Sequence, residues 1–459
     1  NNLIVFVIRG TWHFHYHKTT ISALGERGYR VLALFDRKWS KRDPVDLIEQ
    51  YKKDHAWFDY AWAVPRTDWW RHVFFHSREL LTYRRYSVAQ GQSRYYTAHW
   101  RSYLPRTTKA LLNLPLMQRI LESALAGSLL RGIERIAPGD AHIMAHLTSL
   151  NPACVIATPV TMRFSSCDLE YLKAAKQLGI PTALPVISWD NLSTKGLIHV
   201  QPDRLLAWNE AQKKEAEYYH DIPEVAIRIT GAPVFDGWFG DFKPSRSREA
   251  FCKENGLRAE DPIILYVGSS DARPARDETW LVAALHGALR GSDNPKIRAT
   301  QIIVRPHPAN FQCYAHLQLD SVVVLPKRGG LPSSSEARSL FYDSIAYSAC
   351  AVVGVDTSGI IDTMIAGLPG VAILTEEYRA KQSDAVHFRQ IIEENALEFI
   401  KEPEEFPAIL QSFFDGKDIR KENRTAFITR YLRPRGLNRI AGDAVAEEIE
   451  KLIGQSSRV

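Results

Sequence analysis

Two polar segments in the C-terminal half follow apolar runs, and both carry groups that suit a phosphate. Gln301–Val304 leads into Arg305-Pro306-His307-Pro308, and Ala351–Val355 leads towards Asp356-Thr357-Ser358-Gly359. Arginine offers a planar fork of N–H donors to phosphate oxygens, and a helix N-terminus offers free backbone N–H groups. Ligands of an open parallel sheet bind at the carboxyl ends of its strands. The sequence therefore predicts a site for a nucleotide monophosphate or diphosphate.

Two further segments extend this predicted site. Gly268-Ser269-Ser270 follows the run Ile263–Val267, and its small residues let a ligand approach the backbone. Glu376, Glu377 and Arg379 follow the run Gly370–Leu374 and could hold a ribose or sugar hydroxyl and a phosphate. The alternatives are ordinary turns and helix caps, with Asp356 or Thr357 as the cap. The predicted nucleotide-binding residues are Arg305, His307, Pro308, Thr357, Ser358, Gly359, Gly268, Ser269, Ser270 and Glu377.

The densest polar loop of the N-terminal half, residues 188–196, also follows a predicted strand end. Asp190 is a candidate general base that would deprotonate an acceptor hydroxyl. Lys195 could balance the charge of a phosphate or carboxylate. An Asx-turn built on Asp190 and Asn191 is the structural alternative. The residues that we expect to contact the acceptor or the donor sugar are Trp189, Asn191, Lys195 and Gly196.

Three alternating histidines, His13, His15 and His17, follow the first predicted strand, Leu3–Ile8. On a strand this spacing would place all three on one face, but no carboxylate or cysteine lies nearby to complete a metal site. We therefore expect no bound metal. His13 is instead a second candidate base, or an acceptor contact.

Short apolar runs alternate with helical patterns along both halves, which is typical of parallel sheets covered on both faces. The predicted fold class is α/β, with two Rossmann-like doubly wound domains facing a cleft and with C-terminal helices. We expect an acceptor-binding domain over residues 1–240 and a nucleotide-sugar-binding domain over 241–434. Residues 435–459 are expected to form a helix that can pack back on the N-terminal domain.

Positive charge and aromatic residues concentrate in an insertion at about residues 61–120. Ala61 to Ile120 holds ten Lys/Arg and two Asp/Glu, a balance of +8, whereas the remaining residues sum to −2. Such a mixture could bind a membrane surface, an anionic acceptor or single-stranded nucleic acid. The alternative is one or two large helices with aromatic cores. No recognised nucleic-acid motif accompanies the insertion, so we expect no nucleic-acid partner.

The composition indicates the cellular compartment in which we expect the protein. No apolar run reaches the 18 residues of a membrane span, and the chain opens on a strand pattern without a visible signal peptide. The five cysteines are scattered and form no CxxC pair, which fits a reducing environment. We expect a cytoplasmic protein, with peripheral contact at the inner membrane face as an option.

Taken together, these segments resemble the GT-B glycosyltransferases, and most closely bacterial enzymes of surface-polysaccharide assembly. His307-Pro308 and Thr357-Ser358-Gly359 are similar to the His-Pro and Ser/Thr elements with which sialyltransferase-like and Kdo-transferase-like enzymes bind a CMP-sugar. CDP-glycerol polymerases and UDP-GlcNAc 2-epimerases that do not hydrolyse their substrate show related patterns. The sequence departs from a plain Ser-Ser pair in having Asp356-Thr357-Ser358.

The resemblance implies a metal-independent glycosyltransferase without a cofactor. It would move a sugar from a CMP- or UDP-linked donor to a glycan or lipid-linked acceptor in cell-surface polysaccharide synthesis. A UDP-sugar 2-epimerase and a CDP-polyol phosphotransferase are the enzymatic alternatives. A non-catalytic nucleotide-binding or scaffold protein is the third.

Overall fold

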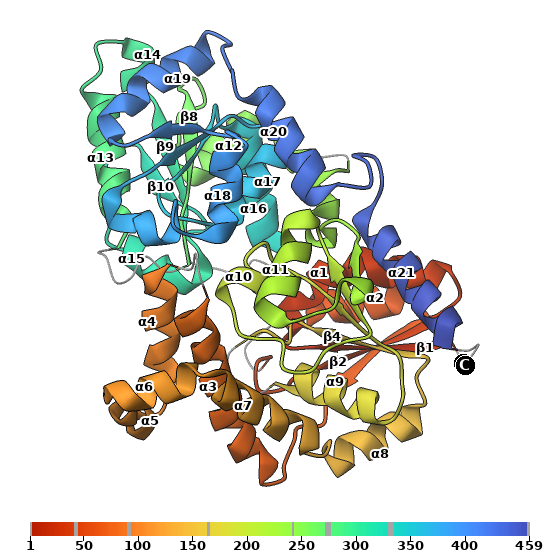
Figure 1. Ribbon diagram of the computed structural model, residues 1–459. Helices are drawn as coiled ribbons and strands as arrows, with labels where there is room; N and C mark the ends of the chain where they lie inside the picture. Colours follow the sequence, from red (N-terminus) through yellow and green to blue (C-terminus); the bar gives the residue numbers. More distant parts are fainter. Residues whose placement is uncertain are drawn as a thin grey trace. The chain divides into compact units, whose positions relative to one another are not determined.

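A computed structural model describes residues 2–40, 45–89, 93–162, 166–240, 243–270, 277–328 and 335–456. The chain forms two compact units (Figure 1). The first combines Asn1–Asp236 with Arg430–Val459, and the second is Gly237–Thr429. The sequence places the boundaries at residues 240 and 434, a few residues later than the points where the chain passes between the units.

The first unit is built on a seven-stranded sheet in which every neighbouring pair is parallel. Its order is β3-β2-β1-β4-β5-β6-β7, so the order reverses between β1 and β4. The strands are β1 Leu3–Ile8, β2 Arg30–Phe35, β3 Phe58–Trp62, β4 Cys154–Thr158, β5 Thr182–Pro185, β6 Arg204–Ala207 and β7 Ile227–Ile229. Ligands of doubly wound sheets bind at such a reversal, outside the carboxyl ends.

Helices cover both faces of this sheet, which is why its central strands are apolar throughout. Ile4, Phe6 and Ile8 of β1 pack in the cluster that includes residues of α1, α2 and α21. Val5 and Val7 pack on the other face with residues of α8 and α9. These helices are α1 Phe14–Glu26, α2 Asp46–Asp54, α8 Ala141–Leu150, α9 Cys167–Gln177 and α21 Ala441–Ser456, and α11 Glu210–His220 follows β6.

Asp236 explains why the last helix belongs to the first unit. Its carboxylate accepts hydrogen bonds from the backbone N–H groups of Ala441 (3.0 Å) and Gly442 (2.8 Å) at the start of α21. It also accepts from Thr19 Oγ1 of α1 at 2.7 Å and pairs with Arg433 Nη2 at 2.7 Å. One buried carboxylate therefore joins the two chain segments of this unit.

The insertion is helical and is anchored to α9 by buried ion pairs. Arg78 Nη1 lies 2.5 Å from Glu170 Oε1, and Arg78 Nε lies 2.8 Å from Glu134 Oε2. Arg66 Nη1 lies 2.8 Å from Glu170 Oε2. Burial alone would raise the pKa of Glu134, but the Arg78 charge and hydrogen bonds lower it to about 2. The insertion helices are α3 Trp70–Val88, α4 Arg94–Tyr103, α5 Arg106–Leu111, α6 Pro115–Glu122 and α7 Ala124–Ile136.

The second unit is built on a six-stranded parallel sheet of order β10-β9-β8-β11-β12-β13. In chain order this is 3-2-1-4-5-6, the dinucleotide-fold arrangement, and the reversal lies between β8 and β11. The strands are β8 Ile263–Val267, β9 Gln301–Arg305, β10 Val322–Val324, β11 Ala351–Val353, β12 Gly370–Ile373 and β13 Glu398–Ile400.

Alternate residues of β8 face different helix layers. Ile264 and Tyr266 pack in the cluster that includes α13 and α19. Val267 lies against Gly359 at the start of α17. Figure 1 shows α13 and α19 on one side of the sheet and α16 and α17 on the other. The helices are α12 Arg248–Asn255, α13 Thr279–Arg290, α14 Pro295–Arg298, α15 Phe311–Tyr314, α16 Ser335–Tyr347, α17 Gly359–Ile365, α18 Val386–Glu393, α19 Phe406–Phe414 and α20 Lys421–Phe427.

Some sequence-based elements were wrong in detail. The sequence pattern predicts a loop over residues 11–16, but these residues form a 3-10 turn, Thr11–His13, followed directly by α1. The pattern also predicts one helix near residues 117–136, but this segment divides at Ser123, whose side chain caps α7 by accepting from Ala126 N. The short strands β3 and β13 were not predicted, because their partly polar sequences lack a continuous apolar run.

Candidate functional site

The carboxyl edge of the second sheet brings together the loops after β8 and β9. Gly268 N donates to the carbonyl of Arg305 at 2.9 Å, and Asn310 Nδ2 donates to the carbonyl of Ser269 at 3.0 Å. A Cβ on Gly268 would lie 2.8 Å from the Tyr314 hydroxyl, so no larger residue fits there without a shift. The loop after β8 borders the point where the strand order reverses, between β8 and β11.

Arg305 lies beside the start of α17 at this edge. A Cβ on Gly359 would lie 3.7 Å from Arg305 Nη1 and 2.6 Å from Val267 Cγ1. The Arg305 guanidinium also stacks 3.9 Å above the centroid of the Phe341 ring. The structure thus brings together two of the predicted phosphate contacts, which are 54 positions apart in the sequence. Glycine at 359 permits the close packing of this turn against Val267.

The His307 ring is half-buried and oriented by a local hydrogen bond. Its Nδ1 accepts from the backbone N–H of Ala309 at 3.2 Å, so the proton of the neutral ring resides on Nε2. Pro306 and Pro308 flank it, and Pro308 begins a 3-10 turn, Pro308–Asn310. Proline restricts the backbone on both sides, so the Nε2 donor has a defined direction.

In the turn before α17, one side chain makes a local hydrogen bond and another is exposed to solvent. Thr357 Oγ1 accepts from Gly359 N at 3.3 Å, which is the capping alternative considered above. Ser358 precedes the helix with an exposed side chain. Asp356 Oδ2 lies 3.0 Å from Nε2 of the buried His387. This turn is therefore tied to α18, while Ser358 faces solvent.

The remaining predicted nucleotide contacts differ in accessibility. Ser269 is fully buried, and both its N–H (2.6 Å) and its hydroxyl (2.7 Å) donate to Glu278 Oε1. Its polar groups therefore hold the loop after β8. Ser270 and Glu377 are exposed. Arg379 pairs with Glu376 at 3.4 Å and with Asp384 at 3.3 Å.

The loop after β5 in the first unit holds Asp190 in a dense set of donors. Ser188 Oγ donates to its Oδ1 at 2.5 Å, Thr194 Oγ1 donates to Oδ2 at 3.1 Å, and Lys195 Nζ lies 3.0 Å from Oδ2. Asn191 Oδ1 accepts from the backbone N–H groups of Ile187 (3.2 Å) and Ser188 (3.1 Å). Asn191 thus holds the loop through backbone groups three and four residues before it, and Lys195 pairs with the candidate base.

Two other residues of this loop are enclosed. Trp189 is 7% exposed, so little of its ring is available to a sugar. Gly196 N donates to the carbonyl of Thr161 at 2.6 Å, which joins this loop to the segment after β4. Their predicted contacts with sugar stay predictions.

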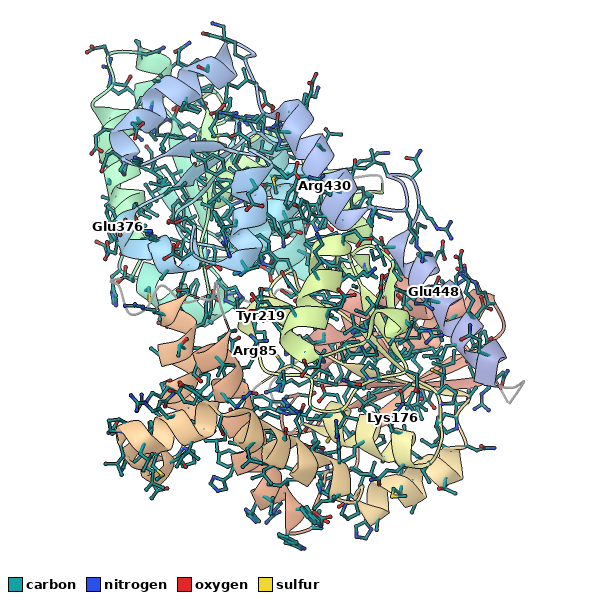
Figure 2. All side chains as sticks on the ribbon, viewed as in Figure 1. Arg85, Lys176, Tyr219, Glu376, Arg430 and Glu448 are labelled. Carbon is teal, nitrogen blue, oxygen red and sulfur yellow. The ribbon has the colours of Figure 1, made fainter. Side chains whose placement is uncertain are left out.

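Side chains of the insertion hold this loop, a role that sequence reasoning missed. Arg85 donates to the carbonyls of Leu192 (3.0 Å) and Ser193 (2.9 Å), and Tyr86 OH donates to that of Lys195 at 2.7 Å. Trp100 Nε1 donates to the Thr194 carbonyl at 3.1 Å. Figure 2 shows Arg85 directed towards Tyr219, whose ring centroid lies 5.1 Å from the guanidinium. Buried Tyr and Trp need partners for their polar ends, and that need was the available signal.

The histidines after β1 lie on a helical turn, so the expected strand spacing was wrong. His13 is 2% exposed, its ring centroid lies 3.5 Å from that of Trp12, and Nδ1 has no hydrogen-bond partner among the described residues. Burial lowers the pKa of His13 well below its ordinary value, and burial lowers that of His17 to about 3. His15 Nδ1 instead lies 2.6 Å from the Trp12 carbonyl. His13 is therefore neutral near pH 7.

Glu215 on α11 is a buried carboxyl that the sequence did not single out. It is 5% exposed, and no described residue donates a hydrogen bond to either oxygen. Burial raises its pKa to about 8; the nearby Arg85 charge opposes this shift and Asp190 adds to it. A carboxyl in this setting is protonated near neutral pH.

This ionisation should make stability depend on pH. The folded-state pKa of Glu215, about 8, lies above the unfolded value, so its contribution is most favourable at pH below the unfolded pKa and is lost as pH rises towards 8. Glu215→Gln should reduce this pH-dependent loss in the free energy of unfolding by about 1–3 kcal/mol. Urea unfolding at acidic and alkaline pH measures it, with the exposed Glu210→Gln on the same helix as control. Equal pH dependence in all three proteins would contradict the assignment.

Comparison with known proteins identifies the fold. A glycosyltransferase from Rickettsia africae is 12% identical, with a TM-score of 0.52 and 99% coverage of both chains. The Methanocaldococcus jannaschii UDP-GlcNAc 2-epimerase is 11% identical, with a TM-score of 0.51 and coverage of 98% of this chain and 99% of the epimerase. The wall teichoic acid polymerase TagF is 11% identical, with a TM-score of 0.50 and coverage of 100% and 90%.

No protein-family model matches the sequence, and the search of curated proteins found no match. The structural likenesses and the two parallel sheets define the class as GT-B: two Rossmann-like α/β domains in one chain. The fold class predicted from sequence is confirmed. At these identities the likeness concerns the fold.

Proposed function

We propose that the chain is a glycosyltransferase that uses a nucleotide-sugar donor. One observation carries the proposal: the reversal of strand order in the second sheet lies beside Arg305 and Gly359, with His307 at the end of the same β9 segment. A nucleotide phosphate at this edge would receive a planar cation, a histidine donor and backbone N–H groups. The solved fold neighbour from M. jannaschii is complexed with UDP-GlcNAc and UDP, which supports a donor of this class.

Arg305 and His307 would act on the leaving phosphate. Negative charge grows on that phosphate as the sugar–phosphate bond breaks, and fixed donors stabilise the transition state more than the ground state. Ser358 and the N–H of Gly359 would add contacts to the phosphate. Gly268 and Ser270 would line the site of the nucleobase, and Glu377 would contact the ribose. Because the Arg305 charge and these donors stabilise the phosphate, we propose that transfer needs no metal, so a chelator should leave turnover unchanged.

The first unit would hold the acceptor, and its base is one of two groups. The neutral His13 is 2% exposed and its Nδ1 is enclosed, whereas the Asp190 side chain is 17% exposed. A base must reach the acceptor hydroxyl, so we favour Asp190 over His13. Lys195, which lies 3.0 Å from Asp190 Oδ2, would then pair with an anionic group of the substrate.

The finer assignment follows the sequence resemblance. We propose an acceptor that is a glycan or lipid-linked sugar of cell-surface polysaccharide synthesis, and a CMP- or UDP-linked donor bound through His-Pro and Ser/Thr elements. The enzyme would be cytoplasmic and would reach a lipid-linked acceptor at the inner membrane face. Among the described residues, no helix has both the length and the apolar character needed to cross a bilayer.

A sugar-nucleotide 2-epimerase is the second candidate, because an epimerase shares this fold at a TM-score of 0.51. The test is incubation with a panel of CMP- and UDP-sugars, with and without acceptor glycans. Acceptor-dependent release of nucleotide supports a transferase, and Asp190→Asn should then slow transfer more than His13→Ala. Interconversion of a UDP-sugar without acceptor selects the epimerase. Binding without turnover would reject both enzymatic functions.

Asp362 should make nucleotide binding depend on pH. Burial raises the pKa of this α17 carboxyl to about 7, against the opposing charges of Arg305 and Arg338. Above that pH its negative charge competes with a phosphate for Arg305, so affinity for a nucleoside diphosphate should fall about three- to tenfold. Calorimetry on either side of pH 7 measures the change. Asp362→Asn should bind tightly at both values; a variant that keeps the wild-type dependence would contradict this role.

A further inference from the structure

Most aromatic side chains of the insertion are not available to a membrane or a nucleic acid. Phe74, Tyr83, Tyr86 and Trp100 are at most 4% exposed. Their rings pack inside the insertion or against the loop after β5. The exposed aromatic side chains of this segment are Trp62 (36%) and Trp69 (63%), which both precede α3.

A different, aliphatic surface lies on α5, α6 and α7 and the turn between α5 and α6. Of the sixteen exposed large apolar side chains described in the chain, seven fall between residues 111 and 136. This concentration exceeds the scattered exposure that is normal for a folded surface. We call these seven the aliphatic face: Leu111, Leu114, Leu116, Ile120, Leu125, Leu129 and Ile136, each 49–78% exposed.

Helix geometry makes this face continuous along each helix. Leu125, Leu129 and Ile136 recur at helical spacing on α7, and Leu116 and Ile120 do so on α6. The opposite side of α7 faces α3, since a Cβ on Gly127 would lie 2.7 Å from Arg84 Cζ and Glu134 pairs with Arg78. The part of the aliphatic face that lies on α7 therefore points away from the α/β core.

The charges around this face complement an anionic surface. Segment 106–136 carries five Lys/Arg and two Asp/Glu, and Glu134 is withdrawn into buried ion pairs with Arg78 and Lys173. Arg106, Arg119 and Arg135 are exposed. Aliphatic residues flanked by cations suit the acyl–headgroup boundary of an anionic bilayer, whereas single-stranded nucleic acid is bound by exposed aromatic rings.

We propose that the aliphatic face is a docking surface for a bilayer rich in anionic phospholipid, with α6 and α7 lying in the plane of the interface. Contact with the membrane is part of the proposed function, and the aliphatic face is the surface that would make this contact. Only the biological reason for docking rests on the proposed function. Apolar side chains would enter the acyl boundary, and the neighbouring arginines would pair with lipid phosphates. Docking by this face would keep the enzyme beside a lipid-linked acceptor.

The test is co-sedimentation of the full chain with vesicles, without nucleotide or sugar. We expect binding to vesicles of phosphatidylcholine mixed with phosphatidylglycerol, weaker binding to phosphatidylcholine alone, and weakening by salt. Leu116→Gln/Ile120→Gln/Leu125→Gln/Leu129→Gln should reduce the partition coefficient at least about tenfold. The matched control, Leu47→Gln/Val225→Gln/Ile419→Gln/Leu437→Gln, replaces equally exposed apolar residues elsewhere and should bind as the wild type does.

Three outcomes would overturn the proposal. The first is wild-type protein that does not bind anionic vesicles. The second is a quadruple variant that keeps the wild-type melting temperature and still binds as strongly as the wild type. The third is a wild-type protein that is a dimer and becomes a monomer in the quadruple variant. The last would assign the face to a second copy of the chain. Vesicle binding by a protein that turns over no nucleotide sugar would reject the proposed function while leaving the docking surface intact.

Discussion

Arg305→Ala is expected to slow sugar transfer about a hundred- to a thousandfold with little change in stability. The guanidinium lies at the carboxyl end of β9 and beside Gly359, where the leaving phosphate would develop charge. Loss of this donor removes an interaction that strengthens in the transition state, so kcat should fall more than KM rises. Steady-state kinetics with the donor identified by the nucleotide-sugar panel measures both constants.

The helix that precedes this strand, α14, offers a matched control for this prediction. Arg298 is exposed and precedes β9, so it lies near the amino edge of the sheet, away from the candidate site. Arg298→Ala should leave kcat within about twofold, as surface substitutions usually do. Arg305→Lys keeps the charge but not the fork, and it should recover part of the rate. Equal activity of Arg305→Ala and Arg298→Ala would remove Arg305 from the mechanism.

Arg78→Met is expected to destabilise the first unit by about 3–5 kcal/mol. Arg78 bridges Glu134 and Glu170, at 2.8 Å and 2.5 Å, in a setting where all three side chains are at most 8% exposed. The substitution leaves two buried carboxylates with fewer partners, although Lys173 and Arg66 still contact them. Urea unfolding followed by tryptophan fluorescence measures the change.

Arg71→Met on the same helix is the control, because Arg71 is exposed. It should change stability by less than about 0.5 kcal/mol. Arg78→Met should also loosen the loop of residues 192–195, which the insertion holds through Arg85, Tyr86 and Trp100. If Arg78→Met lowers the free energy of unfolding by less than Arg71→Met does, the ion pairs do not anchor the insertion.

The polar segments at the carboxyl edge of the second sheet could be predicted because their signals are local. Each apolar run ends in a polar tip, and parallel sheets place such tips on one edge. What local patterns could not show is how each donor is used. Ser269 looks like a ligand contact in the sequence, yet its N–H and hydroxyl both bind Glu278, nine positions away on the other side of the loop. Such pairing depends on burial, which short motifs do not report.

The insertion shows the opposite case, in which composition misled. Its arginines and aromatic residues suggested a surface, but several satisfy backbone carbonyls of the loop after β5, which lies more than 90 positions away in the sequence. Long-range partners of this kind leave no periodic signal. The exposed apolar surface falls instead on residues 111–136, and their sequence does not indicate that these apolar side chains stay exposed.

Calorimetric titration with CMP, CDP and UDP tests the central claim most directly. The account predicts that at least one of these nucleotides binds the wild-type chain with one site, and that Arg305→Ala/His307→Ala abolishes the heat of binding while leaving the melting temperature intact. Binding of equal strength by the double variant, or no binding of any nucleotide by the wild type, would contradict it.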